Sequence, residues 1–344
     1  MMKKLLNTLY VTSPDSYLSL DGENIVIKQD NNELGRVPLH NLQEIATCGF
    51  KGSSPALMAA CAERNVTLTF LSMNGKFLAR VTGEEHGNVV LRKTQYRVSE
   101  DKIASLKIAK NFIVGKIFNE RWVIERATRD YPDRLDILKL KGISGDLNCC
   151  LHDAYLCQDI DTLRGIEGKA ASQYFSVFDD LILQQKRDFY FHTRNRRPPL
   201  DYVNALISFA YTLLASSCAS GLETVGLDPF VGFMHSDRPG RKSLALDVME
   251  ELRSVFADRF VLSIINMQII TSNDFITSEN GAVYLNDKAR KSFITSWQKK
   301  KTTTIVHPFL KEKVEWGMVP YTQALLLART LRGDIDSYPP FCWK

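Results

Sequence analysis

The stretch Lys102–Arg129 constrains the fold more than any other part of the chain. Apolar side chains recur along it at the three- and four-residue spacing of an amphipathic helix, it contains no proline, and Pro132 follows it. Just before it, near residues 98–101, the hydrophobic pattern changes its period. The pattern therefore predicts an α+β fold, with a small β-rich N-terminal domain, residues 1–97, and a larger all-helical C-terminal domain, residues 98–344.

The first part of the chain carries the signals of strands and tight turns. Asp21-Gly22-Glu23-Asn24 lies between two apolar runs, which is the pattern of a β-hairpin. Ser53-Ser54-Pro55 resembles a helix cap followed by proline in the first turn. The expected elements are strands at Tyr17–Leu20, Ile25–Lys28, Leu34–Leu39, Val66–Ser72 and Phe77–Thr82, a turn at Asn74-Gly75, and a helix at Pro55–Arg64.

The second part of the chain shows helical periods separated by turn residues. Asp201 can cap one helix and Gly221 can end it, and Asn286 or Asp287 can cap a later one. The expected helices are Asp161–Gln184, Tyr202–Ala219, one that Ser243 opens, Phe260–Ile270, one that runs through Lys299, and one from Pro320 to the stop at Gly333. A short strand at Val283–Leu285 and a mobile basic loop at Lys299–Thr304 complete the expectation.

Composition excludes several classes of protein. The 344 residues contain no apolar run that approaches the roughly 18 residues of a membrane span, and the N-terminus lacks a convincing signal peptide. We therefore expect a cytoplasmic protein with no membrane partner. The seven cysteines are odd in number and form no CxxC motif, which argues against a disulfide framework and a zinc ribbon.

Basic residues gather in a few short segments, and the formal net charge of +5 allows an acidic partner such as DNA. Solvated loops and helix faces explain such clusters more often than not. If the partner is DNA, these residues are candidates for contacts with its phosphates. The candidates are Arg194, Arg196 and Arg197; Arg241 and Lys242; and Lys288, Arg290, Lys291, Lys299, Lys300 and Lys301.

One loop and the helix after it can supply metal ligands. His235 lies in a Gly/Pro-rich loop, and Asp247 and Glu250 follow on a helix at positions that share one face. An imidazole with carboxylates is a typical ligand set for a divalent metal. The alternative is an ordinary amphipathic helix with a solvated acidic face.

Glu167 breaks the pattern of its own helix. It falls inside the apolar stripe of the predicted helix, between Gly165 and Gly168. A carboxylate on such a face is costly unless it is paired, protonated or bound to a metal. The alternatives are a buried salt bridge, for example to Arg164 or Lys169, or a stripe that ends in a cleft.

Three motifs in order carry a resemblance to a known family. They are RGIEG at residues 164–168, GLDPFVGFMH at residues 226–235 and GRKSLALDVMEELR at residues 240–253. Together they resemble the CRISPR-associated integrase of the spacer-acquisition machinery, the first-numbered Cas protein. The resemblance covers the whole chain, and the tail YPPFCWK resembles the subtype I-C branch.

The resemblance implies an activity and a site. It places the metal ligands on Glu167, His235 and Glu250, all within the helical domain, and an acidic position linked to activity on Asp247, with either a positional role or a role at a second ion. The metal would be Mn²⁺ or Mg²⁺, which two carboxylates and an imidazole suit better than structural zinc. The implied reaction is attack of a DNA 3′-hydroxyl on a phosphodiester at the CRISPR leader–repeat junction, or cleavage when water attacks.

The resemblance also implies partners. These are a second copy of the chain, paired through the β-rich domain, and the small second-numbered Cas protein, which bridges two such dimers into a heterohexamer. Two other functions stay open at this point. One is a DNA-binding scaffold without catalysis, and the other is a general metal-dependent nuclease that cleaves DNA but does not join strands.

Overall fold

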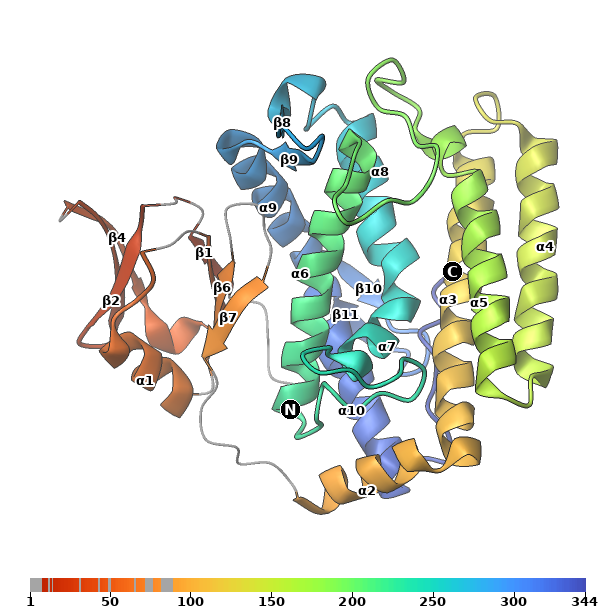
Figure 1. Ribbon diagram of the computed structural model, residues 1–344, viewed down its shortest axis with the longest axis horizontal. Coiled ribbons are helices and arrows are strands. Elements are labelled where there is room, and N and C mark those ends of the chain that lie inside the picture. The colour runs from red at the N-terminus through yellow and green to blue at the C-terminus, as the bar shows by residue number, and fades with distance from the viewer. Residues whose placement is uncertain are drawn as a thin grey trace.

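A sheet-rich N-terminal part and a larger helical part make up the molecule (Figure 1). The computed structural model describes residues 8–11, 13, 15–30, 32–42, 44–48, 51–64, 66–71, 77–81 and 89–344. The predicted turn at Asn74-Gly75 lies outside these residues. The α+β class is confirmed, with small sheets before a predominantly helical region.

Two sheets and one helix form the N-terminal part. The antiparallel sheet consists of β2 (Tyr17–Asp21), β3 (Asn24–Gln29) and β4 (Asn32–Pro38). The mixed sheet has the order β1 (Thr8–Val11), β5 (Glu44–Cys48), β6 (Thr67–Leu71) and β7 (Phe77–Val81), in which only β7 is antiparallel to its neighbour. The helix α1 (Pro55–Glu63) precedes β6. These elements enclose a separate apolar cluster that includes Leu18, Ile25, Leu57 and Leu68.

Local sequence signals account for these elements. Gly22 adopts a positive φ of 56° in the two-residue turn between β2 and β3, a conformation that favours glycine. The Ser54 side chain accepts a hydrogen bond from the backbone N–H of Leu57, and Pro55 occupies the first turn of α1. The hairpin and the capped helix are therefore confirmed, and the strands predicted near Val66 and Phe77 are present as β6 and β7, which pair antiparallel.

Nine helices occur within residues 89–344. They are α2 (Val89–Glu100), α3 (Lys102–Asp130), α4 (Ile137–Leu156), α5 (Ile160–Ser176), α6 (Tyr202–Thr224), α7 (Ser243–Leu252), α8 (Arg259–Asn266), α9 (Asp287–Thr302) and α10 (Val319–Arg332). The same region contains two short hairpins, β8 (Phe275–Thr277) with β9 (Val283–Leu285) and β10 (Thr304–Val306) with β11 (Lys313–Glu315). The predicted strand at Val283–Leu285 is therefore confirmed as β9, but β8, β10 and β11 were not predicted, and the second part is helical with two small hairpins rather than all-helical.

The long helix α3 forms the centre of the helical part. The Asp101 side chain caps it by accepting the N–H groups of Ile103 and Ala104. It packs against α4, α5 and α7, and Figure 1 shows α3, α4 and α5 side by side. Its buried face is not purely apolar, because Lys116 and Glu120 lie among the buried residues. Two ionisable side chains therefore lie in the interior of the helical part.

Helix α2 lies across the predicted boundary between the two domains. It starts at Val89, inside the region predicted to be β-rich. Gln95 of α2 donates to the backbone oxygens of Asp228 and Val231, in the loop before α7. The boundary between residues 97 and 98 stays a prediction, but α2 packs with the helical part.

Four helix ends also differ from the prediction. The predicted helix Phe260–Ile270 is α8, which ends at Asn266. Helix α5 ends at Ser176 and not at the predicted Gln184, and a short 3₁₀ turn follows at Asp179–Leu181. Helix α6 continues past Gly221 to Thr224. A Cβ at Gly221 would lie 3.1 Å from the backbone of Pro320, so the glycine serves close packing against α10. Residues 299–304 are not a loop, since α9 runs to Thr302 and β10 begins at Thr304.

Helix α6 is long and apolar enough to cross a membrane by composition alone. Most of its apolar window, 61%, is buried inside the fold, as in the core helix of a globular protein. It is the one helix of this kind among the described residues.

Candidate active site

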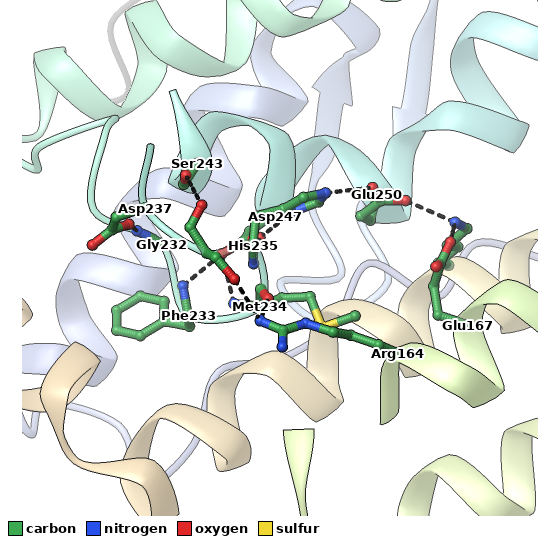
Figure 2. A network of polar contacts seen from close by, with 12 residues as sticks. Arg164, Glu167, Gly232, Phe233, Met234, His235, Asp237, Ser243, Asp247 and Glu250 are labelled. Carbon is green, nitrogen blue, oxygen red and sulfur yellow. Dashed lines mark hydrogen bonds and ion pairs between the residues drawn. The ribbon is translucent and has the colours of Figure 1, made fainter. Parts of the chain in front are cut away.

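The three predicted metal ligands come from separate elements and converge. Glu167 lies on α5, His235 on the loop before α7, and Glu250 on α7 (Figure 2). The Nε2 atom of His235 lies 3.7 Å from Oε1 of Glu250. Glu250 and Glu167 both contact the ammonium group of Lys116, from α3. The predicted convergence is therefore found, but a lysine stands between the two acids.

Asp247 holds His235 in place. Its Oδ2 accepts hydrogen bonds from the backbone N–H groups of Phe233 (2.6 Å) and Met234 (3.0 Å), and its Oδ1 accepts that of His235 (3.0 Å). Oδ1 also lies 2.6 Å from Nδ1 of the His235 ring. When Nδ1 donates to this carboxylate, Nε2 keeps its lone pair for a ligand or substrate. The geometry favours the positional role for Asp247.

Glycine makes this arrangement sterically possible. A Cβ at Gly232 would lie 2.8 Å from Oδ2 of Asp247, well inside contact distance. The loop backbone therefore approaches the carboxylate closely enough for its N–H groups to reach it.

Arg164 joins the same loop to α5. It donates to the carbonyl oxygen of Met234 (2.8 Å) and to Oγ of Ser236 (3.1 Å). The sequence suggested Arg164 or Lys169 as a salt-bridge partner of Glu167. In the structure Arg164 contacts the loop instead. The partner of Glu167 is Lys116, which sequence reasoning missed.

Glu250 is surrounded by cations. Its side chain is 3% exposed, Oε2 lies 2.9 Å from Nζ of Lys116, and Oε1 lies 2.9 Å from Nη2 of Arg253. Arg253 opens a π-helical turn, Arg253–Asp258, directly after α7. Such turns are frequent at functional sites. Here the turn follows the helix that carries Glu250.

The surrounding charges fix the ionisation of the site. Burial acts to raise the pKa of Glu250, but Arg253 and Lys116 lower it to about 2. Burial acts to lower the pKa of Lys116, but Glu250 and Glu120 raise it above its ordinary value. Burial raises the pKa of Glu120 to about 8, against the opposing effect of Lys116. At neutral pH the site therefore holds an ionised Glu250 and a cationic Lys116.

The donor atoms fit a divalent cation, although no group of three metal-ligating side chains is assembled among the described residues. Oε2 of Glu250 is buried, and its contact is the Lys116 ammonium, 2.9 Å away. Both carboxylates already contact one cation, the Lys116 ammonium, and the lone pair of His235 lies beside them. Metal binding by Glu167, His235 and Glu250 stays a prediction.

Comparison with known proteins identifies the family. Residues 9–299 match the family model described as CRISPR associated protein Cas1. The chain belongs to the Cas1 family. A CRISPR-associated endonuclease Cas1 of Chlorobaculum tepidum is 48% identical, and one of Rhodospirillum rubrum is also 48% identical, each over 100% of both chains. These relatives place the chain among the Cas1 endonucleases and integrases, but they do not confirm the subtype I-C branch.

Solved structures share the Cas1 fold. A casposase bound to its integration product matches with a TM-score of 0.84 at 24% identity, over 98% of this chain and 93% of that one. A Cas1 protein from Thermotoga maritima matches with a TM-score of 0.81 at 21% identity, over 95% of this chain and 97% of that one. The likeness shows that the sheet-rich N-terminal part and the helical C-terminal part form the Cas1 architecture.

A cavity of about 410 Å³ adjoins the site of this Cas1 chain. Its lining includes Lys116, Glu120 and Glu167 together with Arg194, Arg196 and Arg253. A larger cavity of about 830 Å³ lies between residues 304–311 and the C-terminal tail, and none of the predicted site residues lines it. The smaller cavity is therefore the one that adjoins the candidate site, through Lys116 and Glu167.

The predicted DNA-contacting residues divide by their exposure. Arg290 and Lys301 are 3% and 4% exposed, so they are removed from the candidate set. Lys300 is half-buried and packs over Trp316. Arg194 is half-buried and donates to Asn204 and Ser208 of α6. Arg241 and Lys242 are half-buried, whereas Arg196, Arg197, Lys288, Lys291 and Lys299 are exposed.

Proposed function

We propose that this Cas1-family chain is a metal-dependent DNA integrase that inserts short DNA fragments into the CRISPR array. The proposal rests on one observation. Glu167 and Glu250 converge beside His235, where both contact the ammonium group of Lys116. A DNA 3′-hydroxyl attacks the phosphodiester at the leader–repeat junction. One phosphorus–oxygen bond forms as another breaks, and the released strand carries a new 3′-hydroxyl. Water in place of the hydroxyl gives a nick.

The side chains have separate roles in this proposal. Glu167, Glu250 and Nε2 of His235 would hold Mn²⁺ or Mg²⁺, which as a Lewis acid polarises the phosphodiester. Asp247 orients His235 through Nδ1. Arg253 offsets the charge of Glu250. The neighbouring cationic cavity suits DNA phosphate oxygens.

The proposed assembly and location extend the same function. We propose a homodimer formed through the β-rich domain, joined by the small second Cas protein into a heterohexamer, in the cytoplasm. In support, a chain of a solved Cas6-RT-Cas1–Cas2 complex contains this fold, with a TM-score of 0.82 at 21% identity over 100% of this chain and 37% of that one. The subtype I-C assignment is also a proposal, and it rests on the YPPFCWK tail.

The exposed arginines after α5 provide a test of the DNA contacts. Reversing the charge of Arg196 and Arg197 to glutamate should weaken DNA binding and flatten its dependence on salt. Each lost phosphate contact lowers the slope of log K against log salt by about 0.9 on duplex DNA. Fluorescence anisotropy over a salt series measures both quantities.

The matched control reverses two exposed lysines elsewhere, Lys311 and Lys313, and so changes the net charge equally. An unchanged salt slope in the arginine variant, or an equal change in the control, would return Arg196 and Arg197 to the role of solvated loop residues.

A strand-transfer assay tests the function itself. The full chain and the small second Cas protein are mixed with a labelled duplex bearing free 3′-hydroxyls and a plasmid carrying leader and repeat. We expect joined product with Mn²⁺ or Mg²⁺ and none with chelator. Nicking without joining would indicate a general nuclease. DNA binding without either reaction would indicate a scaffold.

A further inference from the structure

Lys116 occupies the position between the two acids that a bound cation would take. Its ammonium contacts a carboxylate oxygen of Glu167 and lies 2.9 Å from Oε2 of Glu250. The Lys116 side chain is 5% exposed, and it belongs to α3, whereas the acids belong to α5 and α7. The lysine therefore neutralises two carboxylates that would otherwise repel each other inside the fold.

A divalent ion and this ammonium cannot occupy the same place. Both would lie within about 4 Å of the same carboxylate oxygens, where like charges repel strongly in a poorly solvated site. Lysine carries its charge on a flexible four-carbon stem, so its ammonium can move while its backbone stays in α3. Metal binding to Glu167 and Glu250 therefore requires a second position for the ammonium.

The structure offers such a position one helical turn along α3. Glu120 is 3% exposed, and its Oε2 is buried without a hydrogen-bond partner in the described part of the chain. Residues four apart on a helix are neighbours on its surface, so Glu120 is within reach of the Lys116 side chain. Both residues line the 410 Å³ cavity, which gives the ammonium space to move.

We infer that Lys116 is a built-in cation that competes with the divalent metal for Glu167 and Glu250 and transfers to Glu120 when the metal binds. The inference rests on the proposed metal site and assigns to Lys116 and Glu120 a role in setting metal affinity. In the absence of metal, the Lys116 ammonium neutralises the two carboxylates. Metal binding is weaker because part of its free energy is needed to displace this ammonium.

Metal binding to the full chain tests this inference without measuring activity. Mn²⁺ is titrated into the wild type, Lys116→Met and a control, Lys107→Met, which removes an exposed lysine of the same helix. The bound ion is followed by calorimetry and by electron paramagnetic resonance. Lys116→Met should bind Mn²⁺ more tightly, on the order of tenfold, because the competitor is gone. The control should match the wild type.

A second variant tests the receiving carboxylate and remains informative if Lys116→Met folds poorly. Glu120→Gln should weaken Mn²⁺ binding when Lys116 is present and have no effect in the Lys116→Met background. Equal weakening in both backgrounds, or Lys116→Met binding no tighter than wild type, would overturn the inference. Absence of Mn²⁺ binding by the wild type would instead overturn the proposed metal site.

Discussion

Replacing His235 with alanine should abolish strand transfer and leave the fold intact. The imidazole is 21% exposed, so its removal costs little packing, but it takes away the one nitrogen donor proposed for the metal. Even the mutation of a residue that only supports a metal ligand typically lowers activity or metal affinity 10- to 100-fold. We therefore expect a loss of more than about a hundredfold, measured as the rate of joined-product formation with Mn²⁺.

His152 provides the matched control, because it is an exposed histidine on α4 outside the candidate site. His152→Ala should keep the wild-type rate, and both variants should share the thermal unfolding midpoint of the wild type within a few degrees. Full activity of His235→Ala would remove this residue from the site. A large drop in its unfolding midpoint would show a structural role instead.

Local patterns in the sequence predicted most of the elements that position the site. The apolar period of Lys102–Arg129 gave α3 within one residue at its end, and Asp201 and Asn286 cap α6 and α9 through their side chains. Each signal lies within a few residues of the element that it specifies. The occurrence of the charged Glu167 on an apolar stripe likewise indicated a buried partner, and in the structure this partner is Lys116.

Long-range packing decided what the sequence could not predict. Lys116 and Glu167 lie 51 positions apart, and no local pattern pairs α3 with α5. One signal was available, because Lys116 follows Phe112 and Ile113 on the apolar face of the predicted helix, and the projection that singled out Glu167 would have found it. Gly221 misled the prediction because glycine marks both helix ends and close helix contacts, and only the neighbouring α10 decides between them.

The C-terminal tail is held by a buried acid next to Glu250. Glu251 is fully buried and accepts hydrogen bonds from Nε2 of Gln323 (2.7 Å), from the backbone N–H of Phe341 (2.8 Å) and from the hydroxyl of Tyr338. Asn119 of α3 donates to the carbonyl oxygens of Phe341 and Glu251. The tail therefore ties α3 to α7, the two helices that carry Lys116 and Glu250.

Replacing Glu251 with alanine should destabilise the protein by about 3–5 kcal/mol. Three buried donors would lose their acceptor, and each buried polar group left without a partner costs roughly 1–3 kcal/mol, partly offset by repacking. Urea unfolding followed by tryptophan fluorescence measures the change. Because the donors from Tyr338 and Phe341 belong to the tail, limited proteolysis should cut the tail of the variant earlier than that of the wild type.

The control for this substitution is Glu279→Ala, which removes an exposed glutamate and should change the free energy of unfolding by less than about 0.5 kcal/mol. A loss below about 1 kcal/mol for Glu251→Ala would mean that water or a rearranged tail satisfies the three donors. The tail would then not determine how α3 packs on α7. If the loss is as large as expected, Glu251 stabilises the packing of α3 on α7, and the proposed ligand geometry depends on that packing. Of the two neighbouring glutamates, Glu251 would then have a structural role and Glu250 the proposed role of metal ligand.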